Sequence, residues 1–149
     1  MDLQQLSDRA EITDVITRYT RAVDTGDWDK LDTVFTPDAD IDYTESEGIA
    51  ATYDKVKPWL AEVLPAFFPK RMHTIGQVDI DLTYSEHGDE ADVTAYFHNP
   101  MPMDRQSDDG SVGTVIVEIG GYYHHTMTRT PDGWRSRKLH EEVVWKHNI

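Results

Sequence analysis

The sequence predicts an α+β domain in which N-terminal helices pack in the concave face of a strongly curved, mostly antiparallel sheet. Two observations predict this class. Apolar residues recur at three- and four-residue intervals in the first part of the chain, and they alternate with polar residues after Arg71. Helices followed by a run of antiparallel strands favour helices that cover one face of a sheet. Since the 149 residues contain no linker and no repeat, we expect a single domain over residues 1–149.

The first helix is expected from Leu6 to about Val23. One stripe of its surface is apolar, formed by Ala10, Ile12, Val15, Ile16, Tyr19, Ala22 and Val23. Asp8 and Glu11 have the spacing of a capping box at its start. Gly26 stands where a left-handed residue would end the helix.

A short second helix is expected directly after Gly26. Asp27 can cap it, and its apolar residues are Trp28, Leu31, Val34 and Phe35. Residues 36–38, with Pro37 at their centre, are then expected to turn the chain into a short strand over residues 39–43.

A third helix is expected from Thr52, whose hydroxyl can cap it. Its apolar residues are Val56, Trp59, Leu60, Val63 and Leu64. Pro58 is expected to be tolerated only in the first turn of a helix, because the N–H that proline lacks has no partner there. The exact first residue of this helix is therefore left open.

The rest of the chain alternates as strands do. Strands are expected over residues 72–82, 91–97, 112–129 and 134–145, joined by turns or polar loops at residues 86–89, 104–110 and 131–133. Gly120 and Gly121 suggest a bulge that bends the third of these strands. A sheet curved around helices forms a cone, and its open mouth is the natural pocket.

Composition excludes several classes of function. The chain has 14 Lys and Arg against 28 Asp and Glu, a net charge of −14 that repels nucleic acid and anionic membrane surfaces. It has no cysteine, which excludes disulfides, thiolate nucleophiles and cysteine-based metal sites. The N-terminal residues are polar rather than signal-like, and no apolar run approaches the roughly 20 residues of a membrane span. We therefore expect a soluble protein of the cytoplasm.

The two residues that stand out chemically are Asp24 and His73. Asp24 follows the stripe of the first helix, where the helix dipole disfavours a negative charge, although an Asx turn onto Gly26 would also explain it. His73 begins the first long strand. If folding brings them together, Asp24 would hold one imidazole nitrogen protonated and leave the other as a general base.

Other polar and aromatic residues could join such a site. Tyr19 shares the buried helical stripe, and Tyr43 ends the first strand, so either is a core tyrosine or a phenol donor. Tyr122 and His124 share one face of the third long strand, Tyr123 and His125 the other, and only one set can face the pocket. The seven histidines show no metal-binding spacing, so we expect no metal.

The segments YTRAVDTGDWDKLDTVFTPDADIDY, KRMHTIG, YFHNP and YYHHTMTRTPDGW, in this order, resemble the SnoaL-like branch of the nuclear transport factor 2-like superfamily. Within that branch the sequence is similar to scytalone dehydratase, the bile-acid 7α-dehydratase family and hexachlorocyclohexane dehydrochlorinase, which are lyases without a cofactor. The resemblance implies catalytic roles for Asp24, His73, Tyr19 and Tyr43.

The same resemblance implies a set of substrate contacts. Tyr122 and His124 correspond to the pocket positions on the third long strand. Tyr123 and His125 lie on the opposite face of that strand and are therefore expected to point outward. Met103 stands near the place of a second histidine of scytalone dehydratase. His98 is a candidate to replace that histidine, and Trp28 is a further candidate contact.

The function implied is a cofactor-independent, dehydratase-type β-elimination on an apolar ring compound. His73, oriented by Asp24, would remove a proton while Tyr19 or Tyr43 polarises a carbonyl or assists the leaving group. Two alternatives stay open: a proton-transfer enzyme like ketosteroid isomerase or the polyketide cyclases, and a small-molecule-binding module without catalysis. The resemblance also favours a homodimer or homotrimer formed through the exposed sheet face.

Overall fold

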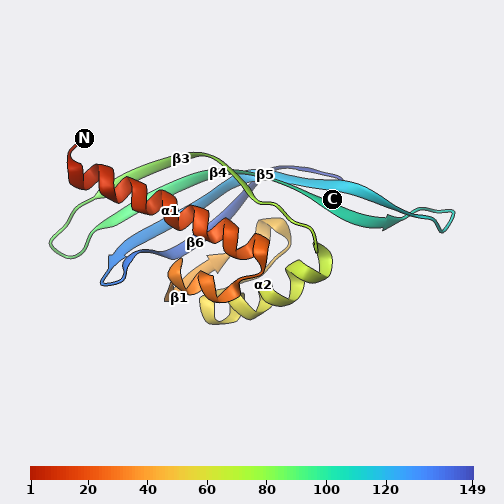
Figure 1. The fold of residues 1–149 in the computed structure, drawn as a ribbon, viewed down its shortest axis with the longest axis horizontal. Coiled ribbons are helices and arrows are strands. Elements are labelled where there is room, and N and C mark those ends of the chain that lie inside the picture. The colour runs from red at the N-terminus through yellow and green to blue at the C-terminus, as the bar shows by residue number, and fades with distance from the viewer.

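The computed structural model describes residues 1–149 and has the predicted α+β architecture (Figure 1). Two α-helices and two short 3₁₀ helices accompany one six-stranded sheet. The elements are α1 (Leu3–Thr25), η1 (Trp28–Thr33), β1 (Phe35–Asp42), η2 (Thr44–Ser46), β2 (Ala50–Thr52), α2 (Tyr53–Phe67), β3 (Thr74–Thr83), β4 (Glu90–Gln106), β5 (Val112–Thr130) and β6 (Gly133–His147). Neither α-helix is both long and apolar enough to cross a membrane.

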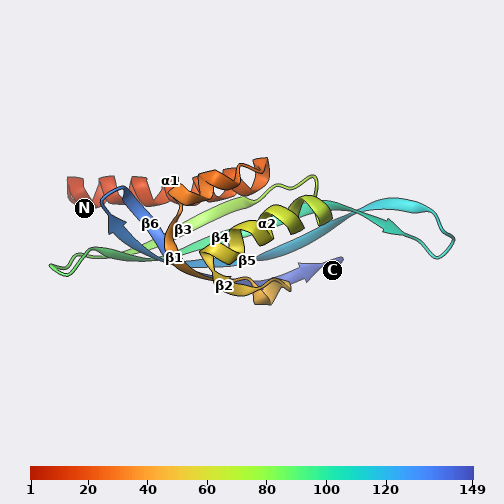
Figure 2. The same cartoon turned by 90° about the horizontal axis from the view of Figure 1, so that it is seen from below.

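The sheet has the strand order β2-β1-β6-β5-β4-β3. Only the β1–β6 pair is parallel, and the other neighbours are antiparallel. Both α-helices lie over the same face of the sheet, as Figure 2 shows. The distal parts of β4 and β5 project beyond the helices as a two-stranded arm (Figure 1).

The core lies between the helices and this inner face of the sheet. Along β4 and β5 the buried residues keep the period of two that a half-buried strand requires. The largest fully buried side chains come from α1, η1 and the strands, and they include Trp134, Tyr123, Phe35, Ile12, Ile16, Leu31, Ile41, Met127 and Leu139.

The start of α1 differs from the prediction, while its end agrees. Asp2 caps the helix, and Asp2 and Gln5 form the capping box, so the prediction that Asp8 and Glu11 form it is wrong. Both predicted residues instead contact the sheet: Asp8 is buried, and Glu11 accepts from the Trp134 backbone N–H at 3.1 Å. At the other end Gly26 has φ 72°, the predicted left-handed conformation.

The second helix and first strand also have different bounds from those predicted. η1 is a 3₁₀ helix that ends at Thr33, and Asp27 makes no side-chain cap. The expected turn at residues 36–38 is wrong, because these residues belong to β1. Pairing with β6 extends the strand, and the register shifts between Phe35 and Asp40, across the segment that holds Pro37. A proline interrupts a ladder less where the pairing is already irregular.

The third helix begins directly after Thr52, as predicted, whereas β4 ends later than predicted. Pro58 lies in the second turn of α2 rather than the first, and the Thr52 hydroxyl makes no cap. β4 continues to Gln106, because it pairs with β5 through Val112, so the polar loop shrinks to the turn after Gln106.

The pairing irregularity predicted at Gly120 and Gly121 is present, but the bulged strand is β6 and not β5 as predicted. The β5–β6 register shifts there, with Gly120 opposite Trp145 and Gly121 opposite Val143. The extra residue, Val144, is therefore on β6, and the alternation along β5 is unbroken. A Cβ at Gly121 would stand 1.9 Å from the carbonyl oxygen of Glu142, so only glycine permits this close approach.

Candidate active site

A cavity of about 500 Å³ opens between α2, the end of α1 and the inner face of the sheet. Hydrophobic side chains make up 15 of its 24 lining residues, mainly from α2, β4 and β5. The polar and charged side chains that line it are Tyr19, Tyr43, Ser46, Glu47, His73, Asn99, Arg105, Tyr123, Glu141, Lys146 and Asn148. A mostly apolar cavity with a few convergent polar groups is the usual form of a small-molecule site.

The structure brings Asp24 and His73 together, as expected. Asp24 lies in the last turn of α1, and His73 immediately precedes β3. The carboxylate lies 2.6 Å from His73 Nδ1, and both carboxylate oxygens accept from the His73 backbone N–H at 3.1 and 2.9 Å. A carboxylate only accepts, so Nδ1 carries the proton and Nε2 keeps its lone pair. Nε2 has no hydrogen-bond partner in the protein.

Tyr19 and Tyr43 form a phenol pair in the wall of the cavity. Their hydroxyl oxygens are 2.6 Å apart, and both side chains are buried. Burial raises the pKa of each phenol well above its ordinary value, so both stay protonated. Because one hydroxyl donates to the other, one proton of the pair is free to be donated to a ligand.

A second polar pair consists of Tyr123 and Asn99. The Asn99 amide donates to the Tyr123 hydroxyl at 3.0 Å, and its carbonyl oxygen accepts from the Thr74 N–H, next to His73, at 3.2 Å. Asn99 therefore links the start of β3 to the Tyr123 phenol, which can donate its own proton into the cavity.

Tyr123, and not Tyr122, lines this cavity, so the predicted parity of β5 is wrong. Tyr123 and His125 are buried on the inner face, whereas Tyr122 and His124 are half-exposed on the outer face. The physical reason is the alternation of buried and exposed residues along β5. Val117, Ile119 and Met127 have the same parity as Tyr123, and their burial determines which face of β5 points inward.

Two other predicted contacts also lie outside the cavity. His98 has the outer parity of β4, hydrogen-bonds Glu118 at 2.9 Å and packs beside Trp145. Trp28 packs against the core under the guanidinium of Arg71, 5.5 Å from the ring centroid. Met103 does line the cavity, as expected.

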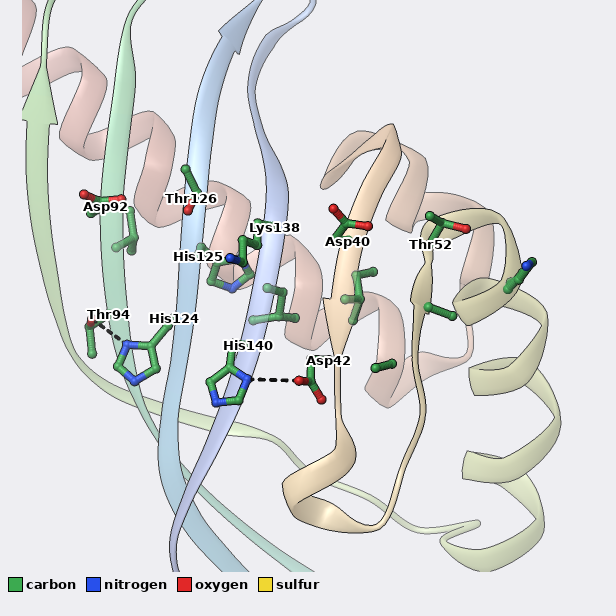
Figure 3. A pocket seen from close by; sticks show the side chains of 16 residues that line it. Asp40, Asp42, Thr52, Asp92, Thr94, His124, His125, Thr126, Lys138 and His140 are labelled. Atoms are coloured by element: carbon green, nitrogen blue, oxygen red, sulfur yellow. Dashed lines mark hydrogen bonds and ion pairs between the residues drawn. The ribbon is translucent and has the colours of Figure 1, made fainter.

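The outer face of the sheet carries a second hollow of about 970 Å³ around His124 and His140, which lie side by side on β5 and β6 (Figure 3). Their nitrogens are engaged: His124 contacts Thr94 at 3.0 Å and Glu142 at 2.8 Å, and His140 contacts Glu45 at 2.8 Å and Asp42 at 3.4 Å. Neither imidazole has a free nitrogen to act as a base, in contrast to His73.

Sequence reasoning missed Glu141 and Asn99. Both have the inward parity of their strands, Glu141 with Leu139 on β6 and Asn99 with Phe97 on β4. The signal in the sequence was a polar residue at a strand position whose neighbours on the same face are apolar. The structure contains no group of three or more His, Cys, Asp or Glu side chains that could hold a metal ion.

Comparison with known proteins places the chain among relatives of the same fold. A family model described as SnoaL-like domain matches residues 4–140 and confirms the predicted resemblance. The uncharacterized protein Rv2910c of Mycobacterium tuberculosis is 37% identical over 137 residues, which span 91% of this chain and 84% of that protein.

Solved structures with the same fold come from several bacteria. The Kfla4162 protein from Kribbella flavida has a TM-score of 0.78 at 22% identity, covering 97% of this chain and 95% of that one. A protein from Novosphingobium aromaticivorans, provisionally described as a scytalone dehydratase, has a TM-score of 0.78 at 16% identity, with coverages of 97% and 89%. Hexachlorocyclohexane dehydrochlorinase LinA-type3 from Novosphingobium barchaimii has a TM-score of 0.74 at 17% identity, with coverages of 99% and 93%.

Proposed function

The chain belongs to the SnoaL-like domain family, and we propose on this premise that it is a cofactor-independent lyase acting on a small, apolar, ring-containing molecule. The reaction is a dehydratase-type β-elimination. One observation carries the proposal: His73 lines an apolar cavity with Nδ1 held by Asp24 and Nε2 free of any protein partner.

His73 is the base in this mechanism. Nε2 takes a proton from a carbon beside a carbonyl, and Asp24 stabilises the imidazolium that forms. The electron pair of the broken C–H bond becomes the new C=C bond as the C–O bond on the adjacent carbon breaks, and the departing oxygen takes up a proton and leaves as water. Asp24 also holds His73 by three contacts, one to imidazole Nδ1 and two to the backbone N–H, so the base is oriented before substrate binds.

The phenol pairs stabilise the charge that this proton transfer creates. Negative charge develops on the carbonyl oxygen as the proton leaves, and the free proton of the Tyr19–Tyr43 pair, or that of Tyr123, can be donated to it. Such donors act strongly in a cavity with apolar walls, because little water competes with them.

The apolar part of the cavity favours a ring-containing substrate. Its aromatic wall includes Trp59, which stacks on Tyr43 with ring centroids 6.1 Å apart, and its sulfur-containing side chains are Met101 and Met103. A volume of about 500 Å³ is within the range of pockets that enclose drug-sized ligands.

A proton-transfer enzyme is the second candidate, because the same base and phenols would serve enolisation without loss of a leaving group. Product mass distinguishes the two. Incubation with a panel of cyclic β-hydroxy ketones should give a product lighter by one water, whereas an isomerase leaves the mass unchanged.

The variants His73→Ala and Asp24→Asn test the base. Each should reduce kcat by about 10²- to 10⁴-fold on the substrate found in that panel. Because the two side chains act as one unit, the double variant should resemble the worse single variant rather than multiply the losses. His124→Ala, on the outer face, is the matched control and should keep wild-type turnover. A His73→Ala enzyme with near wild-type turnover would remove the proposal.

A further inference from the structure

Glu141 is a buried carboxyl that the elimination described above does not use. It lies on β6 with the inward parity of Leu139 and is paired in register with Tyr123 on β5. Glu141 is 6% exposed and lines the same cavity as His73. Its neighbour Glu142 has the opposite parity and is half-exposed beside His124.

Arg105 and Lys146 line the same cavity, but no cationic side chain forms an ion pair with this carboxyl. Glu141 forms no ion pair, and its one side-chain hydrogen-bond partner is the hydroxyl of Ser46 in η2. An ionised carboxylate buried without a cation is costly, and such a group normally takes up a proton instead.

The contacts of Ser46 point to the same protonation state. Its Oγ lies within hydrogen-bond distance of the Tyr43 carbonyl oxygen, at 3.2 Å, and of the Glu141 carboxyl. A hydroxyl has one proton, and a backbone carbonyl can only accept. Both contacts are therefore satisfied together when Glu141 carries a proton and donates it to Ser46 Oγ.

The electrostatic surroundings agree with this assignment. Burial raises the pKa of the Glu141 carboxyl above its ordinary value. The nearby phenols are much weaker acids, since burial also raises the pKa of Tyr19, Tyr43 and Tyr123.

We propose that Glu141 is the general acid of this cavity and gives its proton to the oxygen that leaves the substrate. This inference rests on the proposed elimination. His73 Nε2 takes the proton from carbon, the C=C bond forms, the C–O bond breaks, and the departing oxygen takes the Glu141 proton and leaves as water. Proton return from the imidazolium to the Glu141 carboxylate, directly or through that water, restores the starting state.

The position of Glu141 suits the role of an acid that acts opposite the base His73. His73 reaches the cavity from the edge of the sheet before β3, and Glu141 reaches it from β6, with β4 and β5 between them. A substrate between the two can therefore give a proton to His73 on one side and receive the Glu141 proton on its departing hydroxyl on the other. The substrate class is accordingly a β-hydroxy carbonyl compound whose leaving group must be protonated, and the phenols remain free to hold its carbonyl oxygen.

The protonation state is tested without any substrate. The infrared difference spectrum between wild type and Glu141→Gln at about pH 7 should contain the carbonyl band of a protonated carboxyl. The control difference, wild type against Glu142→Gln, should lack it. If the first spectrum shows an ionised carboxylate instead, Glu141 cannot be the acid and the inference is overturned.

The role in turnover is tested with two probes that differ in the leaving group: a β-hydroxy aryl ketone, which loses water, and the matching β-(para-nitrophenoxy) ketone, whose phenolate leaves without a proton. Glu141→Gln should slow the first by about 10²- to 10⁴-fold and the second by less than about tenfold. Equal slowing of both probes would mean that Glu141 only positions substrate, and the inference would fail.

His73→Ala separates this inference from the proposed function. Both probes lose a proton from carbon, so this variant should slow both. If His73→Ala slows neither, the proposed elimination is wrong. If it slows both while Glu141→Gln slows neither, the elimination stands and the role of Glu141 is refuted.

Discussion

His124 and His125 are adjacent in the sequence, yet their side chains have different environments. His124 lies on the outer face with both nitrogens engaged. His125 is 3% exposed; its Nδ1 contacts the Ser136 hydroxyl at 2.8 Å, and its Nε2 has no partner. Burial, with a smaller contribution from the charge of His124, lowers the pKa of His125 from 6.5 to about 3. The folded protein therefore keeps this imidazole neutral.

Acid sensitivity follows from this buried histidine. Below about pH 6.5 the unfolded chain binds a proton that folded His125 does not, so the unfolding free energy should fall as pH drops toward about 3. The contribution is at most about 1.4 kcal/mol per pH unit. His125→Asn, which can keep the Ser136 contact and does not titrate, should flatten this dependence in urea unfolding measured across that range.

His124→Asn is the control for that measurement. Its imidazole is half-exposed on the opposite face of β5, so its replacement should leave most of the slope in place. Equal slopes for wild type and His125→Asn would contradict the assignment of the acid sensitivity to His125.

At the scale of elements, α1 is held to the sheet by a buried carboxylate near its N-terminal end. Asp8 accepts from Arg129 at 2.8 Å, Trp134 Nε1 at 3.0 Å and the Tyr84 hydroxyl at 2.9 Å. Burial raises the pKa of Asp8, but the hydrogen bonds from these three residues outweigh it and the net direction is downward. The carboxylate therefore connects α1 to β5, β6 and the turn after β3.

Asp8→Ala should lower the unfolding free energy by about 3 kcal/mol, because the variant leaves the buried indole N–H of Trp134 without an acceptor and removes a charged partner of Arg129. Urea unfolding monitored by tryptophan fluorescence would measure the loss. Asp14→Ala, an exposed carboxylate two turns further along α1, should change the unfolding free energy by no more than about 0.5 kcal/mol. Similar losses for the two variants would show that helix propensity, and not the contact with the sheet, is responsible.

At the scale of the whole molecule, neither α-helix covers the outer face of the sheet (Figure 2). Aromatic side chains lie exposed there, with Tyr96 44% and Trp145 43% exposed, and Tyr96 packs edge-on against Tyr122. Exposed aromatic groups with a polar surround are typical of protein interfaces. We propose that this surface forms the interface of the homodimer or homotrimer that the family resemblance implies.

Association through this face predicts a dimer or trimer mass in light scattering coupled to size-exclusion chromatography. Tyr96→Glu places a charge in the face and should shift the protein to the monomer mass. Leu3→Glu is the control, since Leu3 is an exposed apolar residue on α1 and its replacement should not change the mass. A wild-type monomer at high protein concentration would rule out this interface.

Much of the fold was predictable because it depends on short-range periodicity. The helical stripe, the left-handed Gly26 and the alternation along the strands each involve residues close in sequence. The pairing of β1 with β6 joins residues about 100 positions apart, so the strand that replaces the expected turn at Pro37 was not visible locally. The same is true of Asp8, whose partners lie on β5 and β6.

For the candidate site, the sequence by itself determined which residue types are available and, through a family resemblance, that Asp24, His73, Tyr19 and Tyr43 are the candidate catalytic residues. Only the tertiary structure decided that Tyr123 rather than Tyr122 faces the cavity and that Glu141 joins it. A strand offers two faces, and which one points inward is decided by the apolar residues that must be buried against the helices. A carboxyl's protonation likewise depends on neighbours that folding brings from other elements, as Ser46 is brought to Glu141.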